Sequence, residues 1–294
     1  MRFRTVLRID PADHRVFTPV DLGLMSLALP THSMRTPATG TLARALLVVL
    51  VATAGCASPG VEPESRAGVY DYTFGLDAYG TLSNATIRVP LPAEGGESVL
   101  NASVLAPDGT VDGSFEASVV DTRYGPMLEL RAEAFAVEPR YFATVEEDGT
   151  GRRVEISEAE YDPENPDHSK VEFRSVDVVV TVDASYPVDT ETPVGDEPLL
   201  PTTSDRVGTA CRFPTTDSAS CFASGTPLYL EYGAAEETRV SLVVSFEGSN
   251  EWFAGGWTGN HYRESVSHSV TGPQSGWVTA EGHLVVGNGN YPTP

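Results

Sequence analysis

Apolar side chains at every second position are the feature that most constrains how this chain folds. In residues 69–78 this alternation includes Tyr70, Tyr72, Phe74 and Leu76. The same period returns in later segments that contain Ala85, Ile87 and Val89; Leu128 and Leu130; Val176, Val178, Val180 and Val182; Val240, Leu242, Val244 and Phe246; and Val278, Ala280, Leu284 and Val286. Because successive side chains of a strand point to opposite faces, each segment is predicted to be a strand with one buried face.

Turn signals separate these segments, as at Asp108-Gly109. Residues 157–162 have the pattern of a helix start, with the spacing of a capping box, but Pro163 ends that helix after about one turn. Many short strands and almost no helix predict an all-β fold, an antiparallel β-sandwich with Gly/Pro-rich loops. We expect it to form a single domain over residues 69–294.

A strand-poor excursion interrupts this domain at about residues 186–226, and it contains two cysteines. Cys211 and Cys221 lie ten positions apart around a polar loop with no histidine nearby. This arrangement predicts a disulfide in an oxidising compartment, with two free buried thiols as the alternative. Closing a loop of this size contributes about 2.5–3 kcal/mol on the chain-entropy account.

The charge of the chain is strongly negative. There are 41 acidic residues against 19 basic ones, a formal net charge of −22, and Lys170 is the single lysine. Such a surface repels nucleic acid and anionic membranes, so we expect no nucleic-acid partner. In molar salt the screening length falls to about 3 Å, and the repulsion between neighbouring carboxylates is largely removed. The composition therefore favours a halophilic protein.

The N-terminal region has the pattern of an export signal. The uncharged run at residues 45–55 is too short to span a bilayer and matches the apolar core of a signal peptide. Met34 is a conventional start, so residues 1–33 are interpreted as an over-extended start outside the fold. We expect a signal peptide at residues 34–55, followed by a flexible linker rich in Pro, Gly, Ser and Glu at residues 56–68.

The segment Thr53-Ala54-Gly55-Cys56 resembles the lipobox of secreted lipoproteins. This resemblance implies that Cys56 carries a thioether-linked lipid that holds the protein on the outer face of the cytoplasmic membrane. Stable anchoring takes more than one acyl chain. The alternatives are an ordinary signal peptide cleaved near this point and a retained membrane-anchoring helix.

Two tripeptides, at Asn84 and Asn101, match the acceptor for N-glycosylation. If Ala85, Ile87 and Val89 face inward, Asn84 points to solvent. On an exported chain, both asparagines are candidates for a glycan.

No segment carries a hydrolase elbow, a zinc motif, a phosphate-binding loop or a dinucleotide fingerprint. One loop gathers oxygen ligands that calcium accepts, at Asp162, Glu164, Asn165 and Asp167. Its spacing is not that of an EF-hand, and in so acidic a chain a solvated loop is the better interpretation. Calcium is thus the one cofactor that the sequence suggests.

Aromatic residues crowd around Gly255-Gly256. Trp252, Trp257 and Tyr262 are candidates for a platform that binds sugar rings or a partner protein. The alternative, which we favour, is a hairpin turn whose aromatic side chains fill one end of the core.

The segments NATIRVPLP, GSNEWFAGGWTGNHY and GPQSGWVTAEGHLVVGNGNYP resemble parts of exported, uncharacterised proteins of halophilic archaea. The resemblance implies an exported protein that works in high salt, and it implies no catalytic residues. We expect a cell-surface binding or structural module that meets a surface glycan or protein. The alternative is an extracellular hydrolase or glycan-active enzyme, with two carboxyls about 5–9.5 Å apart beside Trp257 or Trp277.

Overall fold

The computed structural model describes residues 3–5, 68–147, 149–211, 216, 218–253 and 255–291 of the 294-residue chain. The expected signal peptide, Cys56 and nearly all of the linker lie outside these described residues. Cys56 lipidation therefore stays a prediction.

The prediction of an all-β, antiparallel fold is confirmed, since every described strand pair is antiparallel. The strands are β1 (Phe3–Thr5), β2 (Val69–Ala78), β3 (Leu82–Pro90), β4 (Ala93–Glu94), β5 (Glu97–Ser98), β6 (Thr110–Val111), β7 (Phe115–Thr122), β8 (Gly125–Phe135), β9 (Arg140–Glu147), β10 (Thr150–Ile156), β11 (His168–Val171), β12 (Arg174–Asp183), β13 (Val207–Thr209), β14 (Ser220–Gly233), β15 (Arg239–Phe253), β16 (Trp257–Thr271) and β17 (Gln274–Gly289).

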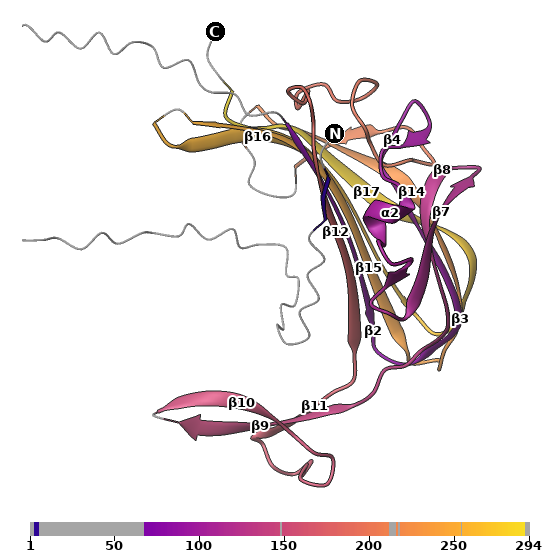
Figure 1. Ribbon diagram of the computed structural model, residues 1–294, viewed down its shortest axis with the longest axis vertical. Helices are drawn as coiled ribbons and strands as arrows, with labels where there is room; N and C mark the ends of the chain where they lie inside the picture. The colour runs from indigo at the N-terminus through magenta and orange to yellow at the C-terminus, as the bar shows by residue number, and fades with distance from the viewer. Residues whose placement is uncertain are drawn as a thin grey trace, which may run out of the picture. The chain divides into compact units, whose positions relative to one another are not determined.

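Twelve of these strands form one sheet, in the order β1-β12-β2-β15-β16-β17-β14-β3-β8-β7-β6, with β13 also paired to β14. β1 belongs to residues 1–33, so the interpretation of that segment as lying outside the fold is wrong for Phe3–Thr5, whose backbone pairs with β12. The sheet curls until β6 comes against β12, and this gives a barrel-like arrangement of two facing walls (Figure 1). Arg174 of β12 links the two ends, since its Nη2 lies 2.5 Å from Asp112 Oδ2 and 2.6 Å from Ser114 Oγ.

The alternating residues form the core between the walls, as their period predicts. On β2 the side chains from Tyr70 to Ala78 are buried at every second position, and the same holds for Val176 to Val182 on β12. These faces meet the inward side chains of β3, β8, β14, β15 and β17 in a single apolar cluster. Burial of this apolar area is the main force that holds the curled sheet together.

Two smaller sheets accompany the main one. β4 and β5 form a hairpin, and β9 pairs with both β10 and β11 in a three-stranded sheet. This second sheet is inserted between β8 and β12, the strands on either side of it in sequence.

Helix is as scarce as predicted, but it forms at a different place. Residues 157–160 make only a turn, in which Glu160 accepts hydrogen bonds from the amide and hydroxyl of Ser157. The short helix α2 (Ala102–Leu105) begins instead at Asn101, whose side chain caps the amide of Val104. Within the described part of the chain, no helix has the length and apolar character that crossing a bilayer requires.

The expected excursion is present and is shorter than predicted. Residues 184–206, which we call the strap, join β12 to β13 and contain one isolated β-bridge among the described residues, between Ala93 and Leu199. β14 already begins at Ser220, because residues 220–226 pair with β17. The predicted disulfide joins Cys211 to Cys221, with 5.2 Å between their Cα atoms.

Candidate functional site

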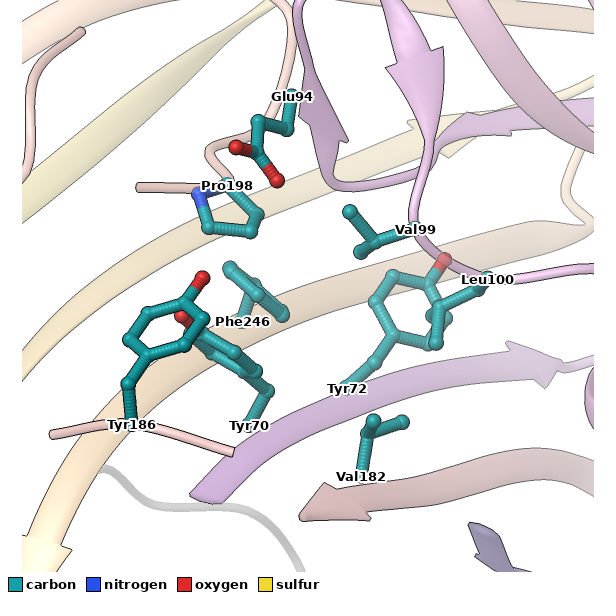
Figure 2. A pocket seen from close by; sticks show the side chains of 9 residues that line it. All are labelled: Tyr70, Tyr72, Glu94, Val99, Leu100, Val182, Tyr186, Pro198 and Phe246. Atoms are coloured by element: carbon teal, nitrogen blue, oxygen red, sulfur yellow. The ribbon is translucent and has the colours of Figure 1, made fainter. Parts of the chain in front are cut away.

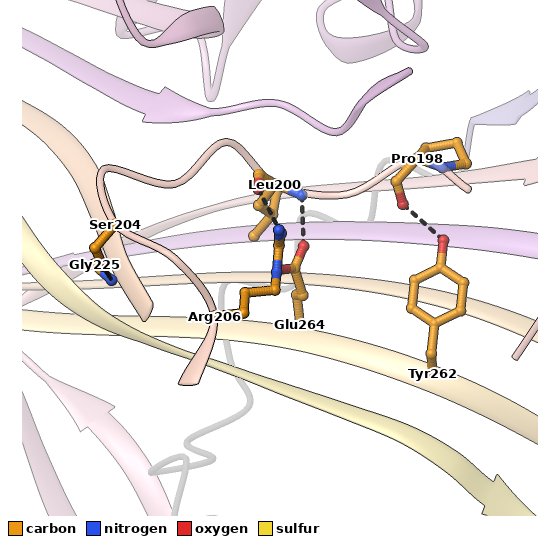
Figure 3. Close-up of polar contacts among 7 residues, drawn as sticks. All are labelled: Pro198, Leu200, Ser204, Arg206, Gly225, Tyr262 and Glu264. Carbon is orange, nitrogen blue, oxygen red and sulfur yellow. Dashed lines mark hydrogen bonds and ion pairs between the residues drawn. The ribbon is translucent and has the colours of Figure 1, made fainter. Parts of the chain in front are cut away.

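The strap is held by polar side chains that replace apolar ones at inward positions of the long strands. On β16 the inward series reads Asn260, Tyr262, Glu264 and Val266, so three of four positions carry a polar group. Tyr262 is fully buried, and its hydroxyl donates to the carbonyl of Pro198 over 2.8 Å (Figure 3). A Cβ at position 248 would overlap the ring of Tyr262, so Gly248 on β15 is required for this packing.

Glu264 makes the most extensive of these contacts. Its carboxylate accepts from the amide of Leu200 at 2.5 Å and from Arg206 Nη2 at 2.6 Å and Nε at 3.1 Å (Figure 3). Arg206 also donates to the carbonyl of Leu200 at 3.0 Å. Burial raises the pKa of Glu264, and the hydrogen bonds and charge of Arg206 oppose that rise. The result is a buried ion pair that clamps the strap to β16.

A second buried carboxylate comes from the strap itself. Glu197 accepts a hydrogen bond from the hydroxyl of Tyr70 on β2 through Oε2, and from the amide of Asp189 at 2.7 Å through Oε1. Burial and the bond to Glu197 both raise the pKa of Tyr70, so this phenol stays protonated and acts as a donor. Both oxygens of Glu197 are thus engaged in holding the strap.

Two asparagines fix the beginning of the strap. Asn250 accepts from the amide of Val188 at 2.7 Å and donates to its carbonyl at 2.8 Å, in the manner of a neighbouring strand. Asn260 accepts from Thr190 and from Asn250, both at 2.9 Å. Because side chains of three strands hold it along its length, the strap is a rigid part of the domain.

The space beneath the strap is almost filled. A cavity of about 10 Å³, room for roughly one water molecule, remains between the strap and the sheet. Figure 2 shows the side chains that line it: Tyr70, Tyr72, Glu94, Val99, Leu100, Val182, Tyr186, Pro198 and Phe246. At this end of the curled sheet, the described side chains therefore form a packed core.

An open pocket of about 310 Å³ also borders the strap, and we call it the strap pocket. It is bounded by the β4–β5 turn, the β7–β8 turn and the strap, with lining residues Ala93, Glu94, Gly95, Gly96, Tyr124, Gly125, Pro126, Val194, Gly195, Glu197, Leu199, Leu200, Pro201, Thr202 and Arg206. Its size is at the lower end of the range for small-molecule sites. Glu94 is exposed in this pocket, whereas Glu197 is 7% exposed.

Tyr124 connects the strap pocket to a line of rings on the outer face of the sheet. The ring of Trp277 on β17 meets Tyr124 edge-on at 4.9 Å between centroids and Tyr229 on β14 at 5.3 Å. Arg123 lies over Tyr124 at 4.6 Å and over Trp277 at 5.6 Å, while Arg88 lies over Tyr229 at 4.5 Å. We call these five residues the aromatic row.

Around Gly255-Gly256 the structure has the hairpin that we favoured over a platform, and it places two of the three candidate rings in the core. Tyr262 is 0% exposed and Trp252 is 6% exposed, so neither ring can present a face to a ligand. Trp257 alone of the three is open, at 62%, and it packs edge-on against Phe253 near the end of the β15–β16 hairpin. Trp252 and Tyr262 are buried because they share the inward parity of Phe246 and Val266 on their strands.

The acidic loop that was a weak candidate for calcium, and for which we favoured a solvated loop, uses its oxygens in local turns. Asp162 accepts from the amide of Glu164 at 2.9 Å, and Asn165 accepts from the amide of Asp167 at 3.0 Å. His168 accepts from the amide of Asp162. No group of three or more His, Cys, Asp or Glu side chains is placed to hold a metal ion among the described residues. The geometry adds nothing to the calcium prediction.

Both candidate glycosylation sites lie at the surface. Asn84 is exposed on β3, in a left-handed conformation with φ of 48°. Asn101 is exposed at the start of α2, and its Oδ1 accepts from Ser103 of the same tripeptide at 2.6 Å. Accessibility is thus met at both positions, and occupancy stays a prediction.

Sequence reasoning missed the strap contacts and the strap pocket. The signal for the first was present, since Glu264 and Asn260 interrupt an otherwise apolar inward series. The pocket had no such signal, because its walls come from three turns far apart in the chain. No protein-family model, curated protein or solved structure matches this chain.

Proposed function

We propose that this protein is an exported, lipid-anchored, halophilic cell-surface protein whose β domain serves as a binding module. Export and anchoring are supported by the lipobox-like segment that ends at Cys56, by the linker that follows and by the disulfide between Cys211 and Cys221. The charge of −22 supports a protein adapted to brine.

The binding role rests on one observation, the continuity of the strap pocket with the aromatic row through Tyr124. Such a surface combines a concave polar site with aromatic and arginine side chains, the residue types enriched at binding hot spots. The buried contacts of the strap keep this surface preorganised, which lowers the entropic cost of binding.

The alternative, carboxylate-based hydrolysis, has less support. That chemistry needs two carboxyls that can both reach the scissile bond, one as an acid and one as a base or nucleophile. In the strap pocket Glu197 has both oxygens bound to the protein, and Glu264 nearby is paired with Arg206. Glu94 is left as the exposed carboxylate of this pocket.

One variant tests both anchoring and binding. Cys56→Ser removes the sulfur that the lipid needs, so the protein should no longer partition into the detergent phase when membranes are dissolved in Triton X-114, whereas Ser58→Ala should still partition there. The purified Cys56→Ser protein, added to washed cell envelopes in molar salt, should sediment with them. Continued detergent partition of Cys56→Ser would contradict lipid anchoring, and failure to bind the envelopes would contradict the binding role.

A further inference from the structure

Arg123 is the arginine of the aromatic row that has no charge partner among the described residues, whereas Arg88 pairs with Glu129. It is exposed in the β7–β8 turn, stacked on Tyr124 and Trp277, and makes no hydrogen bond or ion pair within the described part of the chain. Carboxylates outnumber basic groups by 41 to 19 in the chain, yet none of those in the described residues is paired with this guanidinium. Stacking on two rings fixes the orientation of the planar guanidinium group of Arg123 and leaves its N–H donors unused within the described residues. A fork of this kind fits a carboxylate brought by a ligand.

The neighbouring side chains indicate what else the ligand carries. Tyr124, Trp277 and Tyr229 are partly exposed rings in a continuous line, and such rings pack against the C–H faces of sugar rings. In the strap pocket Glu94 and Thr202 offer polar groups to hydroxyls. A Cβ at Gly95, Gly96 or Gly195 would meet nothing within 4 Å. Because these glycines carry no side chain, their backbone groups are accessible to a ligand in the pocket.

A protein partner fits this surface less well. Stable protein interfaces bury about 800 Å² on each side around an apolar centre. The exposed large apolar side chains of the described residues are scattered over separate elements, and of these Val194 alone lines the strap pocket. A narrow row of rings between charged groups suits a small polar ligand.

We infer that the strap pocket and the aromatic row form one site for an oligosaccharide that bears carboxylate groups, with Arg123 as the residue that recognises the carboxylate. This inference deepens the proposed binding function and rests on it. The negative charge of the chain does not prevent such binding in brine, because a screening length of about 3 Å in molar salt removes long-range repulsion and leaves direct contacts in place.

The test uses the full chain of the Cys56→Ser variant, titrated calorimetrically in molar salt. The probes are trigalacturonate and a glucuronate-containing oligosaccharide, each with its uncharged methyl ester as a control. At least one acid form should bind, and its ester should bind about tenfold or more weakly, since a charge-assisted hydrogen bond is lost. Arg123→Gln should weaken binding of the acid by a similar factor while the ester is unaffected.

Arg239→Gln is the matched control. Arg239 is also an exposed arginine, and it stacks 4.1 Å over the ring of Tyr79. It begins β15 next to Ala78, at the end of β2 that is far from Tyr70, and it does not line the strap pocket. Its replacement should leave the affinity unchanged. Far-UV circular dichroism should show that both variants are folded, because neither side chain makes a hydrogen bond within the described residues.

Several outcomes would overturn the inference. They are an absence of binding by both acids, equal binding of acid and ester, an unchanged affinity in Arg123→Gln, or a polyglutamate peptide that competes as well as the sugar. If the Cys56→Ser protein still binds cell envelopes in any of these cases, the binding function stands and only its assignment to an acidic saccharide fails.

Discussion

Removal of the Glu264 carboxylate should detach the strap, and the size of the effect follows from its contacts. Glu264→Met keeps a side chain of similar length and removes every acceptor. Arg206, 18% exposed, loses its counter-ion, and the buried amide of Leu200 loses its 2.5 Å bond. We assign about 2 kcal/mol to the first, because partial access to water reduces the penalty for a fully buried charge. The orphaned amide costs about 1–2 kcal/mol.

The free energy of unfolding should therefore fall by about 3–4 kcal/mol. The exposed pair of Arg140 and Glu155 provides the control, since it has comparable two-point geometry at 2.7 and 3.0 Å with side chains 42% and 53% exposed. Glu155→Met should cost less than about 1 kcal/mol, because water and salt screen a surface pair. Because the two ion pairs have similar hydrogen-bond geometry, the difference between the two losses of stability measures the effect of burial.

Arg206→Met should behave differently, because a carboxyl can become neutral and an arginine cannot. Loss of Arg206 removes the groups that oppose the rise in the pKa of Glu264, so that pKa should rise further above its ordinary value of 4.5. The folded chain then binds the proton more tightly than the unfolded chain. The stability of this variant should be greatest at low pH and fall by about 1.4 kcal/mol per pH unit between 4.5 and the raised pKa.

Urea denaturation in molar salt, followed by circular dichroism at several pH values, measures both effects. Hydrogen exchange at Leu200 shows whether the strap opens locally before the domain unfolds. The reasoning would be refuted if Glu264→Met lost no more stability than Glu155→Met and exchange at Leu200 stayed slow. If the difference in stability between Arg206→Met and the parent did not change with pH, the argument that Glu264 becomes neutral when Arg206 is lost would be refuted.

Three further outcomes are expected. Replacing Cys211 and Cys221 together by alanine should lower the free energy of unfolding by about 2.5–3 kcal/mol, and an unchanged urea midpoint would show that the disulfide does not stabilise the domain. Burial lowers the pKa of His268 below 6.5. Between pH 6.5 and that lowered pKa the unfolded chain binds the proton and the folded chain does not, so the free energy of unfolding should fall as the pH drops through this range. In denaturation at several pH values, His268→Leu should abolish this dependence. Dialysis below about 0.5 M salt should lower the melting temperature as screening of 41 acidic residues weakens, and a melting temperature independent of salt would contradict the interpretation of the charge.

Local pattern was sufficient to predict the strands β2, β3, β8, β12, β15 and β17. Tyr72, Phe74 and Val178 are buried at the positions that their period requires, because alternation is a property of each strand by itself. The disulfide was also predictable, since Cys211 and Cys221 lie close in sequence and leave little choice of partner. Parity would even have assigned Trp252 to the core, since it lies an even number of positions after Phe246.

The candidate site was decided only by tertiary structure. Tyr70 meets Glu197 across 127 positions, and Tyr262 meets the carbonyl of Pro198 across 64. A period of two says which side of a strand is buried, but it does not say which strand lies beside it or which loop crosses it. Those choices follow from how the whole apolar surface can be buried at once, and they alone bring Tyr124, Arg123 and the strap together.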